Sequence, residues 1–348
     1  MSTRIMRRIL ILLALALIPD AAAAFSWQLD SIAQMGKFPR FCVDTYNWAN
    51  IFFNGTDTAY VRSTGYRWNI KLRTASWADM NEFYFDRHHV MHMQSPYCSS
   101  IGLDVQYMAV AIGYDININK LFGGADRSKS RFNFEFSSAR FSGRLYSVTN
   151  RDGMIITRLN NMNDIDTDFR NMNTNTFGVD LTYFLNMGRY SNGAAFSYSK
   201  LQMRSQGSWI FTAAYQRQKM NFDFRSLPSG IKQWLPDDWS DSTYTASGYN
   251  IGIGAGYGFN WVPCRNLTIG IMALAIPSVN YGYLNSPEKR CSFRLNYRGG
   301  ASVVWNHNRW FIGTSIRADA GFIYSDATTL INALPAFDLK IGWRFNLF

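Results

Sequence analysis

The sequence Phe337-Asp-Leu-Lys-Ile-Gly-Trp-Arg-Phe-Asn-Leu-Phe348 gives the clearest indication of the fold. From Phe337 to Leu347, every second residue is apolar, and the residues between them are polar or glycine. A period of two is that of a β-strand with one apolar and one polar face. Phe348 falls one residue past the apolar alternation. The pattern predicts a terminal amphipathic strand that ends in an aromatic residue.

The same period of two recurs along most of the chain. It is clearest at 251–261, where glycines alternate with apolar residues and leave one face small. We also predict strands at about 66–73, 101–107, 110–118, 132–136, 177–185, 209–215, 267–284, 291–305 and 310–324. Many of these reach the ~9–11 residues with which a tilted strand crosses a bilayer. The pattern predicts an all-β fold, an antiparallel transmembrane β-barrel of about twelve strands, with about fourteen as the alternative if 82–94 adds to the wall.

The connections between the last strands alternate in length. Segments 262–266 and 306–309 are predicted to be short turns, whereas 223–247 and 325–336 are predicted to be longer loops. Outer-membrane barrels have short periplasmic turns and longer extracellular loops. This alternation therefore predicts that the last strand ends at the periplasmic face.

The composition agrees with a barrel. Hydrophobic residues make up 47% of the chain and charged residues 17%, against about 25% charged in soluble domains. Beyond the N-terminus, no apolar run approaches the ~20 residues of a transmembrane helix. A soluble periplasmic β protein, with the apolar faces as its core, remains the alternative.

The N-terminus has the form of an export signal. Arginines at 4, 7 and 8 precede an apolar run at 9–18, and four alanines at 21–24 follow. We predict a cleaved signal peptide at 1–24, a periplasmic lead-in at 25–65 and an outer-membrane barrel at 66–348. The expected location is the outer membrane of a Gram-negative bacterium.

The chain is basic, with a formal net charge of +11. Loss of residues 1–24 removes three arginines and one aspartate and leaves +9. Lysines and arginines alternate with apolar residues and form no continuous run, so we do not expect nucleic acid as a partner. Outer-membrane lipid, lipopolysaccharide and small anionic solutes are the expected partners.

Charged residues on the polar faces are expected to line the lumen. The candidates are Arg67, Lys71, Arg73, Asp104, Glu135, Arg144, Asp180, Arg294, Arg298, Arg317, Asp319, Asp338 and Arg344. Pairing among them would fill the interior, whereas a continuous basic stripe would make an anion-selective channel. Interiors of about eight strands are filled and those of sixteen or more are open, so the strand number leaves both arrangements open.

The last strand resembles the signal by which the barrel assembly machinery recognises outer-membrane proteins. Lys340, Gly342, Phe345 and Leu347 fit its form, polar–x–Gly–x–x–apolar–x–apolar, and Phe348 is the terminal aromatic residue. The chain also resembles an uncharacterised outer-membrane barrel family of Bacteroidota. The motifs that carry this likeness are Asp57-Thr-Ala-Tyr-Val61, Ile101-Gly-Leu103, Leu185-Asn-Met-Gly-Arg-Tyr-Ser191 and Ser205-Gln-Gly-Ser-Trp209. That family is a domain of unknown function, so the resemblance implies a fold and a location but no activity.

Sites for catalysis are weakly indicated. His88 and His92 would share the face of a helix, as metal ligands do, but the segment has no helix caps and favours a turn or short strand. His307, in a tight turn, is badly placed to activate a serine at the lipid-facing wall. We therefore predict no metal, no cofactor and no enzyme activity. The expected role is a narrow pore or a structural or surface-interaction protein, and an outer-membrane enzyme acting on lipid or lipopolysaccharide is the alternative.

The four cysteines, Cys42, Cys98, Cys264 and Cys291, match no zinc or redox spacing. Cys264 and Cys291 fall at opposite ends of one predicted strand, so we expect no disulfide between them. The sequence leaves pairing of Cys42 with Cys98 open.

Overall fold

The computed structural model describes residues 40, 41, 44, 48, 52, 53, 55–107, 110–118, 129–151, 153–284, 289–324 and 328–346. The chain divides into two units, Met1–Gly55 and Thr56–Phe348, and every strand named below belongs to the second. The predicted signal peptide, Cys42, Leu347 and Phe348 lie outside the described residues.

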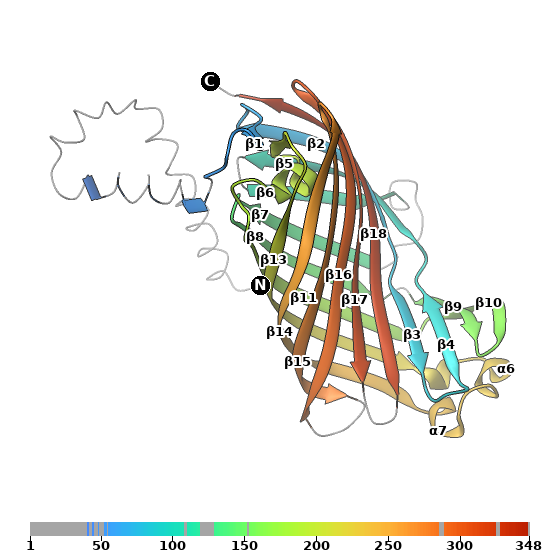
Figure 1. The fold of residues 1–348 in the computed structure, drawn as a ribbon. Coiled ribbons are helices and arrows are strands. Elements are labelled where there is room, and N and C mark those ends of the chain that lie inside the picture. The colour runs from blue at the N-terminus through green and yellow to red at the C-terminus, as the bar shows by residue number, and fades with distance from the viewer. Residues whose placement is uncertain are drawn as a thin grey trace. The chain divides into compact units, whose positions relative to one another are not determined.

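Twelve antiparallel strands close into a barrel (Figure 1). They are β2 (Trp68–Trp77), β5 (Cys98–Tyr107), β6 (Val110–Asn117), β7 (Lys129–Ser137), β8 (Phe141–Asn150), β11 (Met172–Phe184), β13 (Gln206–Asp223), β14 (Thr243–Cys264), β15 (Leu267–Leu284), β16 (Lys289–His307), β17 (Trp310–Tyr324) and β18 (Thr329–Phe345). The ring closes where β18 pairs with β2, from Ala336↔Trp77 to Phe345↔Trp68. The predicted fold class and the predicted number of twelve wall strands are confirmed.

A folded extension continues the sheet at one end of the barrel. It comprises β3 (Met80–Tyr84), β4 (Val90–Gln94), β9 (Met154–Leu159), β10 (Met162–Phe169), and the short helices η2 (Phe224–Ser226), α6 (Ser229–Lys232) and α7 (Asp237–Ser240). β3 pairs with the first residues of β18, so the extension lies away from the end at which β18 finishes (Figure 1). Residues 82–94 therefore form a hairpin beside the barrel and add no strand to its closed wall.

The prediction of a long loop at 325–336 is wrong. β18 begins at Thr329 and pairs there with Tyr324, so the connection is short. Ala333, Pro335 and Ala336 interrupt the alternation of large apolar and polar residues, which hid the first half of this strand from the pattern.

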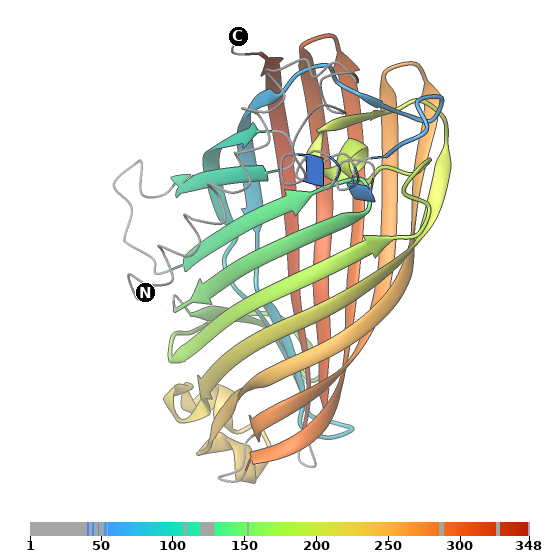
Figure 2. The same cartoon turned by 90° about the vertical axis from the view of Figure 1, so that its left-hand side faces the viewer.

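The wall is taller on one side than on the other. β14, β15 and β16 have 22, 18 and 19 residues, whereas β6 and β7 have 8 and 9. Figure 2 shows the long strands sweeping diagonally towards the extension. An aromatic core, in which Phe83 makes edge contacts with Phe222, Phe224 and Tyr244, packs this end.

The two faces of the wall have the polarity of a membrane protein. Outward-facing Ile251 and Ile253 are 62% and 74% exposed, whereas inward-facing Asp180 is 3% exposed. Exposed tryptophans within three residues of a strand end mark the end at which β18 finishes: Trp209, Trp261, Trp305, Trp310 and Trp343. A soluble β protein would bury such isoleucines and expose such an aspartate, so this is a transmembrane β-barrel. No helix among the described residues is long and apolar enough to cross a membrane.

Candidate functional site

A segment between β11 and β13 enters the lumen. It contains the π-helical turn η1 (Gly193–Ser197) and the short strand β12 (Lys200–Gln202), which pairs with β1 (Val61–Ser63). We call residues 190–198 the lumen plug. Its large side chains, Tyr190, Phe196 and Tyr198, are at most 2% exposed. The plug fills the barrel near the end at which β18 finishes.

Glycines in the wall make room for the plug. A Cβ on Gly258 would lie 2.5 Å from the Tyr190 hydroxyl, and one on Gly313 would lie 2.6 Å from the ring of Tyr198. The small glycine face of β14 thus accommodates a large side chain at Gly258.

Three cations of the wall bind three successive carbonyls of the plug. Arg317 donates to the Phe196 carbonyl at 3.3 Å. Lys71 Nζ donates to the Ser197 carbonyl at 3.1 Å, and Arg344 donates to the Tyr198 carbonyl at 3.0 Å. These charge-assisted bonds come from β17, β2 and β18 and fasten the plug to one side of the wall.

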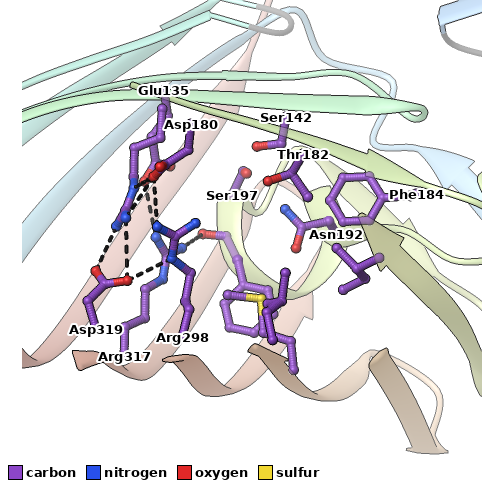
Figure 3. Close-up of a pocket in the computed structure, with 15 residues that line it drawn as sticks. Glu135, Ser142, Asp180, Thr182, Phe184, Asn192, Ser197, Arg298, Arg317 and Asp319 are labelled. Carbon is purple, nitrogen blue, oxygen red and sulfur yellow. Dashed lines mark hydrogen bonds and ion pairs between the residues drawn. The ribbon is translucent and has the colours of Figure 1, made fainter. Parts of the chain in front are cut away.

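On the side of the plug that faces the extension, four charged residues form an ion-pair quartet. Arg144 contacts Asp180 at 2.9 Å and Asp319 at 3.1 Å. Arg298 contacts the same two carboxylates at 2.8 and 2.7 Å. In Figure 3, Asp180 reaches from one wall towards Arg298 and Asp319 on the other.

The quartet spans the full width of the lumen. Arg144 lies on β8 and Asp319 on β17, six places apart in the ring of twelve strands and therefore opposite each other. Two small cavities, of about 70 and 50 Å³, lie beside the quartet. Spaces of this size hold a few waters. The geometry is that of a filled interior at this level.

Most of the predicted lumen residues take part in such contacts. Besides the quartet, Arg317 contacts Glu135 at 3.1 Å, and Arg73 contacts Asp104 at 3.5 Å. Arg294 is 5% exposed and donates to Gln218 Oε1, and Asp338 is 8% exposed and lines a further cavity. Arg67 differs from these residues in position. It is exposed and precedes β2, where its backbone N–H donates to Asn346 Oδ1.

The sequence reasoning missed the plug and several inward-facing charged residues, among them Asp115, Arg131 and Lys340. Asp115 lies on the polar face of the predicted strand 110–118, and Arg131 directly precedes the predicted strand 132–136. Continuing the alternation of polar and apolar residues would have identified both. Lys340 was assigned only to the assembly signal, but it also lies 3.8 Å from Asp104. The plug has no period of two, so the sequence pattern gave no sign of it.

The histidines at 88–92 form a turn and a strand, as favoured from the sequence. His89 Nδ1 lies 2.7 Å from Asp86 Oδ2, and His92 Nδ1 lies 2.7 Å from Thr157 Oγ1. The His88 backbone N–H and the His89 side chain lower the pKa of exposed Asp86 to about 2. Among the described residues, no group of His, Cys, Asp and Glu could hold a metal ion.

The cysteines follow the sequence argument in part. Cys264 on β14 and Cys291 on β16 are exposed and form no disulfide with each other. Buried Cys98 accepts a hydrogen bond from Asn117 at 3.5 Å. Its possible partner Cys42 lies outside the described residues.

Comparisons with known proteins give a family and no activity. A family model described as "Domain of unknown function (DUF4421)" matches residues 55–345, which agrees with the expected resemblance. A search of curated proteins gave no match.

Among solved structures, the chain is similar to the Escherichia coli outer membrane protease OmpT, with 8% identity and a TM-score of 0.38 over 80% of this chain and 97% of that one. It is also similar to OprG from Pseudomonas aeruginosa, with 9% identity and a TM-score of 0.28 over 82% and 100%. The P. putida toluene transporter TodX gives 8% identity and a TM-score of 0.23 over 81% and 91%. Identities this low say nothing about a shared activity.

Proposed function

The chain belongs to the family described as Domain of unknown function (DUF4421), and we propose that it is a non-enzymatic outer-membrane barrel that conducts no solute and presents a folded surface outside. The observation that carries the proposal is the ion-pair quartet, in which Arg144 and Asp319 join opposite walls of the barrel. The lumen plug blocks the same passage a second time.

The quartet favours closure over conduction for an electrostatic reason. Each guanidinium contacts both carboxylates, so the charges are neutralised in pairs and leave no continuous basic stripe at this level. Breaking a buried pair leaves an uncompensated charge at a cost of about 3–5 kcal/mol. A solute would have to break several such pairs to pass.

In this proposal the chain is exported by a cleaved signal peptide and assembled through its last strand. We propose that the end at which β18 finishes faces the periplasm; the two-residue turns β14–β15 and β16–β17 at this end, and the long connection β13–β14 at the other, support this orientation. The extension then lies outside the cell. Its core includes buried Trp239, while Trp234 and Tyr97 stay 46% and 61% exposed and are available for contact.

Planar-bilayer recording of the refolded full chain tests the proposal. We expect no steady current at any applied voltage, whereas an open porin in the same bilayer conducts. Heat-modifiable migration on a gel verifies that the recorded protein is folded. Stable single-channel steps from the unmodified protein would contradict closure.

A further inference from the structure

The wall is weakly joined between β6 and β7. Three residue pairs connect these strands, Val110↔Phe136, Ala111↔Glu135 and Ile112↔Phe134. β7 and β8, by comparison, pair from Lys129↔Asn150 to Ser137↔Ser142. Residues 113–117 and 129–133 are not paired with each other, so the two strands part towards the extension over about 15–17 Å at ~3.3 Å per residue. We call this the β6–β7 opening.

A cavity of about 350 Å³ lies behind the opening. Its walls include Gly113 and Asp115 of β6, and Arg131 and Asn133 of β7. It is five times as large as the 70 Å³ cavity beside the quartet. Its volume falls within the ~300–1,000 Å³ of small-molecule sites.

Most charges around this cavity already have partners. Arg73 is paired with Asp115, and Arg317 with Glu135. Lys129 Nζ donates to the Pro96 carbonyl at 2.8 Å.

Arg131 and Asp338 are different, because neither side chain makes a hydrogen bond or ion pair with another described residue. Both line the cavity, and Asp338 is 8% exposed. The two charges attract each other across the cavity without direct contact, so a ligand that carries both charges can contact each of them.

The outer surface beside the opening is apolar. Ile112 of β6 and Phe132 of β7 are 52% and 50% exposed. A ligand that reaches the cavity from this side therefore passes apolar side chains that face the membrane. A polar head inside the wall and an apolar tail outside it is the arrangement of a bound lipid.

We propose that this cavity binds the zwitterionic headgroup of a membrane phospholipid, with its phosphate at Arg131, its ammonium group at Asp338 and its acyl chains leaving through the β6–β7 opening. The inference goes beyond the proposed function. It needs a barrel in a bilayer but not a closed one, so conduction would overturn the proposed function and leave this site intact.

Binding of short-chain lipids to the refolded full chain in detergent, measured by calorimetry, tests the site. We expect dihexanoyl phosphatidylethanolamine to bind about tenfold more tightly than dihexanoyl phosphatidylglycerol, which lacks the ammonium group. Free phosphoethanolamine has the same head without tails, and we expect it to bind at least about tenfold more weakly than the lipid. Equal affinity for the two lipids, or for lipid and free head, would overturn the proposal.

Two variants locate the charges. Arg131→Gln is expected to lower the affinity for both lipids by about tenfold. Asp338→Asn is expected to abolish the preference for phosphatidylethanolamine. Arg217→Gln removes the same charge from an exposed position on β13 and is the matched control, with unchanged affinities expected. Heat-modifiable migration verifies the fold of each variant. Unchanged binding by folded Arg131→Gln protein would overturn the site.

Discussion

A single buried carboxylate, Asp79, shows how polar groups are placed where the barrel meets its extension. It lies between β2 and β3, is 2% exposed, and accepts hydrogen bonds from Asn81, Thr174 and Asn332 at 2.9–3.0 Å. Burial raises its pKa above the usual value of an aspartate, although these hydrogen bonds oppose the shift. The ionised form therefore carries a desolvation cost that its neutral partners do not remove.

We predict that Asp79→Asn makes the barrel more stable than the unmodified protein at neutral pH. Because the folded-state pKa is raised, the Asp79 contribution is fully present at low pH and is lost as the pH rises through that value. The advantage of the variant should grow with pH and vanish below about pH 4, where an unfolded aspartate is protonated. Denaturant unfolding in vesicles at several pH values measures it. Asp79→Ala is the control, which should lose about 1–3 kcal/mol because three donors lose their acceptor.

The quartet gives a second prediction for a single residue. Asp319→Ala leaves Arg144 and Arg298 sharing one carboxylate. Because the Asp319 side chain is 34% exposed, we expect a loss in unfolding free energy of about 2–3 kcal/mol, below the cost of breaking a fully buried pair. Asp168→Ala removes a similar ion pair, with Arg170, in which both side chains are more than 60% exposed, and should change stability by less than about 1 kcal/mol. Equal effects of the two substitutions in denaturant unfolding would show that the quartet is not a desolvated network.

Among the elements, the plug depends on glycines in the wall. Gly313→Val places a side chain against Tyr198, whose fully buried ring cannot move outwards. We expect a loss of about 1–3 kcal/mol from overpacking, measured as a lower denaturation midpoint. Gly299→Val, on β16, is the matched control, because nothing lies within 4 Å of the added Cβ. If both valine variants unfold at the same denaturant concentration, the plug does not press on the wall as described.

Strands bounded by tight turns could be predicted best from sequence. The spans of β15 and β17 were predicted to the residue although 271–277 of β15 is apolar on both faces, because the short turns before Leu267 and Trp310 mark where these strands begin. Small residues and a proline hid the first half of β18. β9 and β10 went unpredicted, since Asn160, Asp164 and Asp166 adopt positive φ and break the period. The plug follows contacts with distant strands, which no local pattern records.

For the whole molecule, the sequence established which side of the wall is polar but not how the charges across it meet. Arg144 and Asp319 are 175 residues apart in the chain, and their contact depends on ring closure. The choice between a channel and a filled barrel therefore belongs to the tertiary structure. In the proposed closed barrel, the quartet and the plug act as two barriers in series along the same lumen.

Two barriers in series predict that neither one alone controls the passage. We expect the double substitution Asp180→Asn with Asp319→Asn, and the replacement of residues 192–198 by a Gly-Ser linker, each to leave the barrel closed in planar bilayers. Their combination should give stable current steps. That current should favour anions, because Lys71, Arg317 and Arg344 lose their plug carbonyls while the lumen loses two carboxylates. Heat-modifiable migration verifies the fold of each variant. Conduction by a variant that lacks one barrier would show that the remaining barrier does not seal the lumen. Cation selectivity in the combined variant would contradict the charge argument.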